Sequence, residues 1–596
     1  MKTQFTPAFT RTLVACSVMS VVSAQAETTS DSSSTLSPLV VTATSTPVST
    51  ADSLFSVTVI DAEEVNAQQA QQITELLAAQ PGVDVSSNGG YGKTTSVYMR
   101  GAGAESTKFL LDGIPLYSAT SGGAPFENIP TSLIDRLEMV RGPKATLYGA
   151  DAVGGVIQMF LPEAGDEPEA NLAIGAGSFN TKTTELTLAG SHDNTQYLLS
   201  AGIFETDGDI VKKGEEAQGY RNENILLNVG HQFDSGARIS SLVMNSAGRN
   251  HYVGDESDYQ VQVIGLGASF PVTDNWETEF KVSQARNDRT TVSSAETYAT
   301  TTQTARWSNT VWADDHEFVL GAETSEDSVD VTRYQAPDRR NDAAFAQALF
   351  DFGVTSLQLN LRQDHNSAYG DSTTGGVAAG YKLDAIHRLR ASYGEAFAAP
   401  TFNDLYYPGS GDPTLDATRS KTVEVGIRAD YGDRYWDVAV FDASYGDLVI
   451  WSNYTGSWKA YNVDSTAQGI ELSSGLTLEQ WRLGAAFTWL DAKDDKTGFQ
   501  LPKRAQRSAR LSLDRTFEQG QIGMTLIGAN GRATTLGSDE MLPGYVTLDL
   551  RASYDFAIDW NAELSVKNAL DKEYQTAKDY INPGRGVFLT LNYSAF

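Results

Sequence analysis

Apolar and polar side chains alternate along most of the chain that follows Glu163. In residues 545–554 the apolar positions share one face of an extended strand, and the polar positions share the other. The same alternation recurs in three further segments: 423–428, 481–489 and 562–567. A period of two, interrupted by Gly, Asn and Asp, predicts antiparallel β-strands that are joined by turns.

The length of this alternating region predicts the size of the sheet. It covers about 430 residues without a helical interruption, which at roughly 20 residues per strand and connection predicts about 22 strands. Charged residues on one face and aromatic residues at strand ends are typical of a lipid-facing barrel with an aqueous lumen. A soluble β-sandwich also alternates, so a single strand does not distinguish the two folds. The repetition over this length favours the barrel.

A segment of different texture precedes the barrel region. From Phe55 to Pro162 the pattern predicts one small α/β domain, with a strand at 56–60, a helix after Asp61 and a second helix at 73–79. Short strands then alternate with Gly-rich turns: 83–85, 96–100, 108–111, 134–140 and 155–160. A barrel of about 22 strands is wide enough to contain such a domain.

The first residues, 1–26, have the features of a secretory signal peptide: a basic start with Lys2 and Arg11, a short apolar centre, and small residues before the cut. Residues 13–16 also fit a lipoprotein cleavage box. We favour the cut after residue 26 because apolar residues continue beyond Cys16. Cleavage there removes Cys16, the single cysteine, and leaves neither a disulfide nor a thiolate metal site.

Composition and charge narrow the class of protein. After the signal peptide no run of 18 apolar residues occurs, so the sequence offers no transmembrane helix. Only helices and closed barrels satisfy every backbone group in lipid, so a signal peptide, many aromatic residues and 52 glycines suggest a barrel of a bacterial outer membrane. A large secreted soluble β protein has the same composition, which alone does not separate the two. A net charge of −31 argues against nucleic-acid binding. We interpret it as a solvated acidic surface rather than as a cation channel.

No enzymatic constellation is visible in the sequence. Gly92-Lys93-Thr94 hints at a phosphate-binding loop, but Ser87 stands where the leading glycine belongs. The six histidines are scattered, and neither a G-x-S-x-G nor an H-E-x-x-H motif occurs. We therefore expect no catalytic residues.

The sharpest motif is R-G-P-x-A-x-x-Y-G-A-x-A-x-G-G-V-I at 141–157. It closely resembles the plug-domain signature of the TonB-dependent outer-membrane receptors and transporters. The sequences at 97–101 and 111–115 resemble two further plug motifs, and those at 394–401 and 568–596 resemble barrel motifs of that family. The resemblance covers essentially the whole mature chain, in the right order.

The resemblance implies an all-β transmembrane barrel of about 22 antiparallel strands, with an N-terminal α/β plug domain in its lumen. The protein would be a monomer in the bacterial outer membrane, in contact with its lipid. The domains that we expect are a signal peptide (1–26), a flexible leader (27–54), the plug (55–162) and the barrel (163–596).

A short β-prone segment lies within the polar leader: Leu39, Val40, Val41, Thr42 and Ala43. From the residues alone it is either an edge strand of the next domain or a peptide that a partner captures by strand addition. The resemblance implies the second, since this segment looks like the Ton box of the family. Its partner would then be the TonB–ExbB–ExbD energy-coupling complex, which grips the Ton box from the periplasm.

Two arginines on predicted plug strands are candidates for contact with the barrel. Arg100 and Arg141 would face wall carboxylates such as Glu424 or Glu563 and form buried ion pairs, which can rearrange during transport. The alternative is that both arginines are ordinary surface residues of the plug.

Two loops resemble the substrate loops of the vitamin B12 (cobalamin) branch of the family, at 83–92 and 117–123. The residues that the resemblance implies for substrate binding are Asn88, Gly89, Gly90, Tyr91, Tyr117, Ser118, Thr120 and Ser121. Neutral polar loops suit a large, amide-rich corrinoid, whereas a ferric-siderophore site would show clustered Arg and aromatic residues. The alternatives are structural turns, a ferric-siderophore receptor, and a non-transporting adhesin or phage-receptor barrel.

The same branch orders its outer loops with calcium. Here the candidate ligands are Asp207, Asp209, Asp255 and Asp258, because clusters of carboxylate oxygens suit Ca²⁺. The paired aspartates that the family carries between these loops are absent at 218–223, so solvated acidic turns are the alternative. No other cofactor is expected.

Overall fold

The computed structural model describes residues 38–595, except 45, 163, 166, 454 and 455. The predicted signal peptide and residues 27–37 of the predicted leader lie outside the described residues. Among the described residues, no helix is long and apolar enough to cross a membrane.

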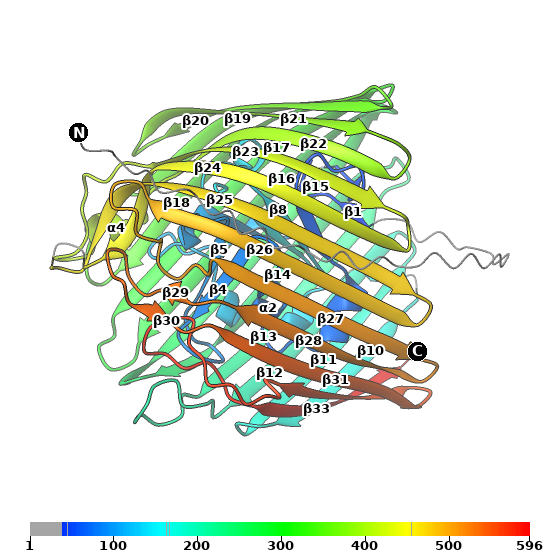
Figure 1. Ribbon diagram of the computed structural model, residues 1–596. Coiled ribbons are helices and arrows are strands. Elements are labelled where there is room, and N and C mark those ends of the chain that lie inside the picture. Colours follow the sequence, from blue (N-terminus) through cyan, green and yellow to red (C-terminus); the bar gives the residue numbers. More distant parts are fainter. Residues whose placement is uncertain (1–37, 45, 163, 166, 454–455, 596) are drawn as a thin grey trace, which may run out of the picture. The chain divides into compact units, whose positions relative to one another are not determined.

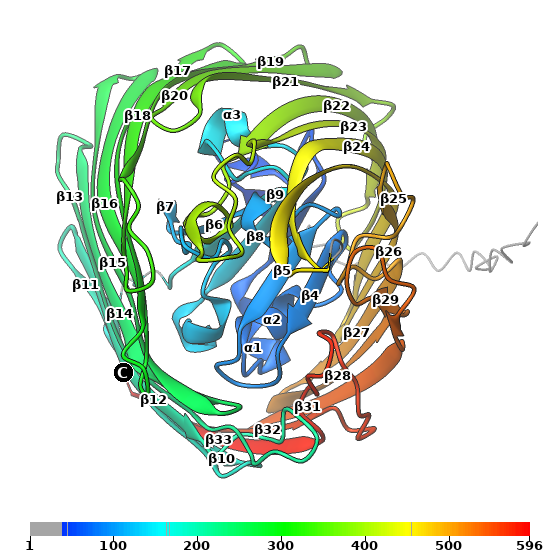
Figure 2. The same cartoon turned by 90° about the vertical axis from the view of Figure 1, so that its left-hand side faces the viewer.

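A closed antiparallel barrel contains most of the chain (Figures 1 and 2). Within the described ranges it has 22 strands, and β33 pairs with β10 from Ala170↔Ala595 to Gly177↔Phe588, which closes the sheet. The prediction of about 22 antiparallel strands is therefore confirmed. The barrel strands are β10 (Glu169–Gly177), β11 (Thr181–His192), β12 (Thr195–Thr206), β13 (Tyr220–Gln232), β14 (Arg238–Tyr252), β15 (Asp255–Thr273), β16 (Trp276–Thr291), β17 (Thr297–Ala313), β18 (His316–Val331), β19 (Arg339–Asp351), β20 (Thr355–Asn366), β21 (Gly370–Lys382), β22 (His387–Ala398), β23 (Thr418–Asp430), β24 (Arg434–Ser452), β25 (Lys459–Leu478), β26 (Trp481–Asp494), β27 (Arg507–Phe517), β28 (Gly520–Ala529), β31 (Tyr545–Ala557), β32 (Trp560–Lys567) and β33 (Gly586–Ala595).

The alternation along each strand separates a lipid-facing side from a lumenal side. On β15, Val261 and Val263 are fully buried against the inner domain, whereas Ile264 and Leu266 are exposed on the outer face. Apolar side chains that face outward all around the barrel are stable only where lipid covers them.

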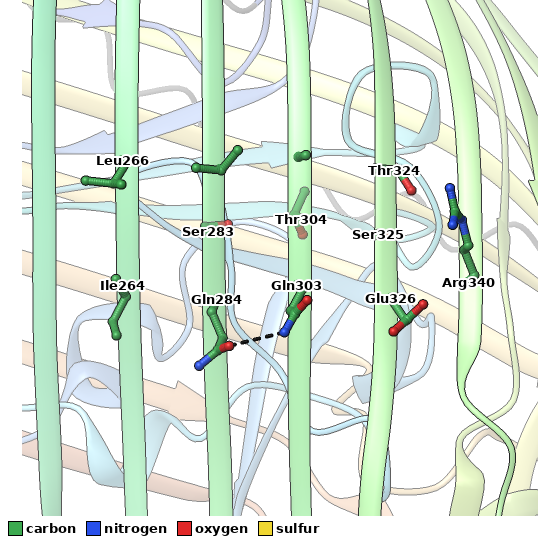
Figure 3. Close-up of a pocket in the computed structure, with 12 residues that line it drawn as sticks. Ile264, Leu266, Ser283, Gln284, Gln303, Thr304, Thr324, Ser325, Glu326 and Arg340 are labelled. Atoms are coloured by element: carbon green, nitrogen blue, oxygen red, sulfur yellow. Dashed lines mark hydrogen bonds between the residues drawn. The ribbon is translucent and has the colours of Figure 1, made fainter.

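On β15 to β19 the apolar outer face of the barrel gives way to polar side chains (Figure 3). A groove of about 460 Å³ lies there between Leu266 on one side and a row of polar side chains on the other. Within this row Gln303 Nε2 donates a hydrogen bond to Gln284 Oε1 (3.3 Å), and the row continues to Glu326 and Arg340. The groove lies outside the lumen, so we interpret it as an edge of the lipid-facing band rather than as a substrate site.

The two ends of the barrel differ in the length of their connections. One end has short connections such as 193–194 and 314–315, whereas the other has long ones at 207–219, 399–417 and 568–585. The long connections contain a short helix, α4 (Phe402–Tyr406), and a small hairpin of β29 (Arg532–Ala533) and β30 (Met541–Leu542). Short turns face the periplasm and long loops the exterior in barrels of this kind.

A plug domain lies in the lumen (Figure 2). Its main sheet has the order β3-β8-β9-β6-β7, in which β6 and β9 are parallel, and β4 pairs with β5 in a second sheet. The elements are β1 (Leu39–Val40), β2 (Val48–Ser49), β3 (Val57–Ile60), α1 (Ala62–Gln68), α2 (Ile73–Leu77), β4 (Val83–Ser87), β5 (Thr95–Met99), β6 (Thr107–Leu111), β7 (Ile114–Pro115), β8 (Arg136–Arg141), α3 (Ala145–Tyr148) and β9 (Gly155–Phe160). Three 3₁₀ turns connect them, at Ala104–Ser106, Phe126–Asn128 and Thr131–Leu133.

The local sequence explains where the first plug helix begins and how the plug meets the wall. The Asp61 side chain accepts a hydrogen bond from Glu64 N (2.9 Å), which caps α1. Plug residues such as Leu111 and Met159 share one apolar cluster with Leu226 and Met244 of the barrel wall. The plug core therefore continues into the wall.

Candidate functional site

The segment predicted to bind TonB, 39–43, is docked at the short-turn end of the barrel. Val40, Thr42 and Ala43 are fully buried, whereas Leu39 is 53% exposed. Within the described part of the chain, β1 pairs with β2 in a separate two-stranded sheet and does not extend the plug sheet. It lies near the periplasmic turns, because Thr46 Oγ1 donates to Glu317 Oε1 (2.9 Å) at the start of β18.

One buried carboxylate holds this segment. Glu138 Oε2, on β8, accepts hydrogen bonds from Val41 N (3.0 Å), Thr42 N (2.8 Å) and Thr42 Oγ1 (2.6 Å). Tyr148 donates its hydroxyl to Thr42 O (3.0 Å). Hydrogen bonds to an ionised group are among the stronger ones in proteins. The same backbone N–H groups cannot bond an added strand while they bond Glu138.

Replacing Glu138 by Ala should release the segment. Hydrogen bonds to charged groups contribute roughly 1.5–3 kcal/mol each, so even one lost bond corresponds to a change of about tenfold or more in the exposed population. The measurement is the rate of thiol labelling of a Val40→Cys variant, with and without Glu138→Ala. Val40→Cys suits this purpose because Val40 is fully buried.

Glu138→Gln is the matched control for this labelling experiment, since it keeps one acceptor oxygen and should give an intermediate rate. Equal labelling rates with Glu138 and with Ala would show that the carboxylate does not hold the segment.

The second feature is a buried cluster of ion pairs between plug and wall. Arg100 Nη1 lies 2.7 Å from Glu424 Oε2, and Arg100 Nη2 lies 2.8 Å from Glu471 Oε2. Arg141 Nε lies 3.0 Å from Glu471 Oε2. Glu424 is on β23 and Glu471 on β25, whereas Glu563 lies on the far wall, beside a cavity described below.

The backbone at Arg100 aims its side chain at the wall. Arg100 has φ +51°, a conformation that non-glycine residues rarely adopt and that costs about 1–2 kcal/mol. Gly101 follows with φ +82°, and a Cβ there would lie 3.0 Å from the Ala492 Cβ of the wall. Tyr445 donates its hydroxyl to the carbonyl of Arg100 (2.9 Å), which fixes the turn. The strained turn at Arg100 and the close approach of Gly101 to the wall both hold the Arg100 side chain against the wall carboxylates.

The cluster continues into the wall and is balanced in charge. Arg390 bonds Asp437 with two nitrogens (both 2.7 Å) and Glu424 with Nε (3.2 Å). Three arginines thus face three carboxylates: Arg100, Arg141 and Arg390 against Glu424, Asp437 and Glu471. Buried charges are tolerated only in such paired arrangements.

The two plug arginines differ in how well they are compensated. Burial alone lowers the pKa of Arg100, but the charges of Glu471 and Glu424 outweigh it and raise that pKa above its ordinary value. Burial lowers the pKa of Arg141, and the attraction of Glu471 does not overcome this effect and the repulsion from Arg100. Glu471 is the main attractive charge for both arginines, and Arg100 has Glu424 as a second carboxylate partner.

The first predicted substrate loop lies at the long-loop end, beneath two barrel connections. Gly89 packs against Val211, Gly90 packs against Pro583, and Tyr91 is 7% exposed. Asn88 is partly exposed. The covering loops bond to each other, since Ile581 N donates to Val211 O (2.8 Å).

The second predicted loop is also at this end, and α4 covers it. Tyr117 donates its hydroxyl to Asp327 Oδ1 on β18 (2.5 Å). Asn403 N, in α4, donates to Thr120 O (3.0 Å). Ser118 is half-buried, whereas Ser121 is exposed. α4 was not predicted, although Thr401 and Asp404 form a capping box at its start, a signal that can be read from the sequence.

The four candidate calcium ligands lie in two separate places. Asp207 accepts from Asn180 Nδ2 (3.0 Å) and Asp209 accepts from Gly584 N (3.0 Å). Asp258 pairs with Arg249 (2.7 Å) and Asp255 accepts from Ser293. In the described part of the chain, no three His, Cys, Asp or Glu side chains group closely enough to hold a metal ion. Calcium binding here stays a prediction from the resemblance.

Comparison with known proteins agrees with this geometry. Residues 168–569 match the family described as TonB dependent receptor-like, beta-barrel, and residues 49–156 match the TonB-dependent Receptor Plug Domain. The chain is 29% identical over 565 residues to the vitamin B12 transporter BtuB of Photobacterium profundum. The aligned region covers 90% of this chain and 92% of that transporter. It is 27% identical over 572 residues to the vitamin B12 transporter BtuB of Vibrio vulnificus, covering 91% and 92%.

A solved structure shares the fold. The ferric enterobactin receptor PfeA of Pseudomonas aeruginosa superposes with a TM-score of 0.78 at 18% identity, covering 90% of this chain and 98% of that one. The family match spans both the plug and the barrel, in the order in which the structure has them. The chain therefore belongs to the TonB-dependent receptor family and is a TonB-dependent transporter of the outer membrane.

Proposed function

We propose that this transporter imports vitamin B12 (cobalamin) or a related corrinoid. The observation that carries the proposal is the similarity to vitamin B12 transporters along at least 90% of both chains. The family is non-enzymatic, and its membership leaves no place for the alternative of a non-transporting adhesin barrel.

The residues of the predicted substrate loops support a neutral, amide-rich ligand. The eight predicted positions carry amide, hydroxyl and backbone groups, without an arginine or lysine: Asn88, Gly89, Gly90, Tyr91, Tyr117, Ser118, Thr120 and Ser121. An anionic ferric siderophore would favour basic residues there. The structural likeness to the enterobactin receptor, at 18% identity, concerns the fold and does not favour that substrate.

The proposed mechanism connects the outer face to the Ton box through β8. Substrate binding at the plug loops would shift the plug, and the segment 39–43 would then leave Glu138. TonB would pair with the freed backbone by strand addition. The TonB–ExbB–ExbD complex would then pull on this segment, driven by the proton-motive force. Residues 44–56 link the pulled segment to Ser56, whose hydroxyl donates to Glu424 Oε1 (2.8 Å), and to β3, which pairs with β8. A pull on the segment therefore reaches the ion pairs that seat the plug.

A binding titration tests the substrate. Purified protein in detergent is titrated with cyanocobalamin, with and without Ca²⁺, and in parallel with ferric enterobactin. We expect saturable binding of cyanocobalamin, tightened by Ca²⁺ if the aspartate loops bind it, and no binding of the ferric chelate. Preferential binding of the ferric chelate would make a siderophore the substrate instead of a corrinoid. An absence of cyanocobalamin binding would reject the proposal.

A further inference from the structure

A cavity of about 730 Å³ separates the plug from one side of the barrel wall. The wall is formed by β10 to β13, β28 and β31 to β33, and the plug side by α1, residues 69–72 and the 3₁₀ turns at 126–133. Figure 2 shows these strands along one side of the barrel, facing α1 and α2. The lining on β33 runs from Phe588 to Ser594, a path of about 20 Å along a strand. The cavity is therefore a passage along the wall rather than a local pocket.

The inner end of the passage reaches the short-turn end of the barrel. Glu63 and Asn66 of α1 line it there, and both side chains are exposed. This end of the passage is therefore open to solvent on the periplasmic side.

An aromatic cluster closes the outer end. It consists of Tyr91 from the plug and Phe204, Tyr220, Tyr259 and Phe588 from the wall. Tyr91 lies 5.3 Å from Phe204 and 6.5 Å from Phe588 between ring centroids, and Tyr220 stacks on Tyr259 at 5.8 Å. Tyr91, Phe204, Tyr220 and Phe588 also line the cavity.

The plug loop at 88–93 holds this closure in place. Gly92 has φ +71° and lies flat against Tyr220, so that a Cβ at this position would collide with the ring. Lys93 Nζ donates to Tyr91 O and to Asn250 Oδ1 (both 2.8 Å). Displacement of this one loop would withdraw Tyr91 and leave the wall aromatics without their plug partner.

The lining has a definite chemistry. Amide and hydroxyl side chains dominate the wall, among them Asn171, Thr183, Asn224, Asn561, Thr590 and Asn592. The charged residues that line the described cavity are all acidic, at Glu63, Glu127, Glu185 and Glu563, and none is Lys, Arg or His.

Glu127 is a buried acidic group of this lining, and the attraction of Arg289 does not offset the effect of its burial. Burial raises the pKa of this plug carboxyl to about 7. Its Oε2 is buried and has no hydrogen-bond partner among the described residues. A donor group or a cation that enters the passage would satisfy this oxygen, whereas an anion would be repelled.

We propose that the substrate crosses the barrel through this passage, that the aromatic cluster is its outer closure, and that the lining admits neutral or cationic polar molecules and disfavours anions. The proposal rests on the transport function proposed above and names a path for it. Tyr91 belongs both to a predicted substrate loop and to the closure, so a bound substrate would touch the group that must move. A corrinoid exceeds the present volume, so the passage must widen as the plug shifts.

The test removes the closure and follows small solutes. The triple variant Tyr91→Ser, Phe204→Ser, Phe588→Ser is reconstituted into liposomes, and swelling is measured with glucose and with gluconate, which match in size but differ in charge. We expect glucose influx that the wild-type protein lacks, and a severalfold slower influx of gluconate. The single variant Phe588→Ala gives a second measurement if the triple variant does not assemble.

Two cysteine positions identify the path. In the triple variant, Thr590→Cys modified with a polyethylene glycol maleimide should abolish glucose influx, whereas modified Asn360→Cys, on the lumenal side of β20 opposite the passage, should not. Removing Tyr334 and Tyr406, an aromatic pair in the outer loops, is the matched control and should cause no influx.

The outcomes separate this proposal from the choice of substrate. Assembled variants without glucose influx, faster influx of gluconate than of glucose, or influx that only the Asn360→Cys label blocks would each overturn the passage. These readouts do not use cyanocobalamin, so they stand even if the titration rejects a corrinoid. If the titration succeeds, labelled Thr590→Cys in the otherwise unchanged chain should bind cyanocobalamin but not import it.

Discussion

Replacing Val41 by Pro should abolish TonB-dependent uptake and leave substrate binding at the outer face unchanged. Strand addition depends on backbone N–H groups, and proline removes one in the middle of the predicted Ton box. The predicted substrate loops lie at the opposite end of the barrel, so the change should not reach them. Uptake and binding of labelled cyanocobalamin, measured in cells and with purified protein, give the two readouts.

The structure shows why this variant needs a particular control. Val41 N also donates to Glu138 Oε2, so proline both loosens the docked segment and removes a donor for TonB. Glu138→Ala loosens the segment but keeps every N–H group, and should therefore retain uptake. Val41→Ala, which keeps the N–H, should behave like the wild type. Normal uptake by the proline variant would refute the assignment of the Ton box.

The fold was largely predictable because its forces are periodic along the sequence. The alternation in 545–554 follows from lipid on one side of β31 and the plugged lumen on the other, and Val546 and Leu550 are exposed while Thr547 and Arg551 are buried. The plug strands fall within a few residues of their predicted ranges. Short elements were missed: β7 has two residues and α3 has four, too few to set up a period.

The contacts of the site were less predictable because they join residues that are far apart in sequence. Arg100 was a candidate for plug–wall contact, but nothing in the local sequence distinguishes Glu471 as its partner from Glu563. Glu138 stands between Leu137 and Met139 in β8 and gives no sign that it bonds a peptide 96 residues earlier. Similarly, the loops that cover Gly89 and Thr120 follow from tertiary structure alone. The periodicity of the chain predicts which side chains share a face of a strand. Which side chains pair across the lumen depends on the three-dimensional structure.

These contacts place two opposing requirements on the plug. It must stay seated without substrate, which the apolar cluster shared with the wall ensures, and it must move when TonB pulls. The free energy of apolar contact is proportional to the buried area, so it is lost gradually as two surfaces separate. A buried ion pair, in contrast, loses most of its attraction once its partners separate into water. A seat built partly from ion pairs can therefore break abruptly when the pull reaches β8 through β3.

Replacing Glu471 by Met should destabilise the seated plug by about 3–5 kcal/mol, the usual cost of breaking a buried pair by removing one partner. The cluster would then hold three arginines against two carboxylates. Among the described residues, Arg141 would keep hydrogen bonds to the Thr58 hydroxyl and the Val57 carbonyl, both neutral. Met conserves volume, so the effect is electrostatic rather than a cavity. Urea-dependent exposure of the plug to trypsin measures the loss, while the barrel itself should remain folded.

A second substitution decides whether charge balance is the cause. In the double variant Arg141→Met, Glu471→Met, two arginines face two carboxylates, and Arg100 retains Glu424 at 2.7 Å. Most of the lost stability should return, since a buried pair replaced by apolar residues of similar size is often neutral or stabilising. Glu540→Met, which removes the partner of exposed Lys578, is the matched surface control and should cost less than about 1 kcal/mol. If the double variant is as unstable as Glu471→Met alone, packing around Glu471 seats the plug, and the ion pairs do not.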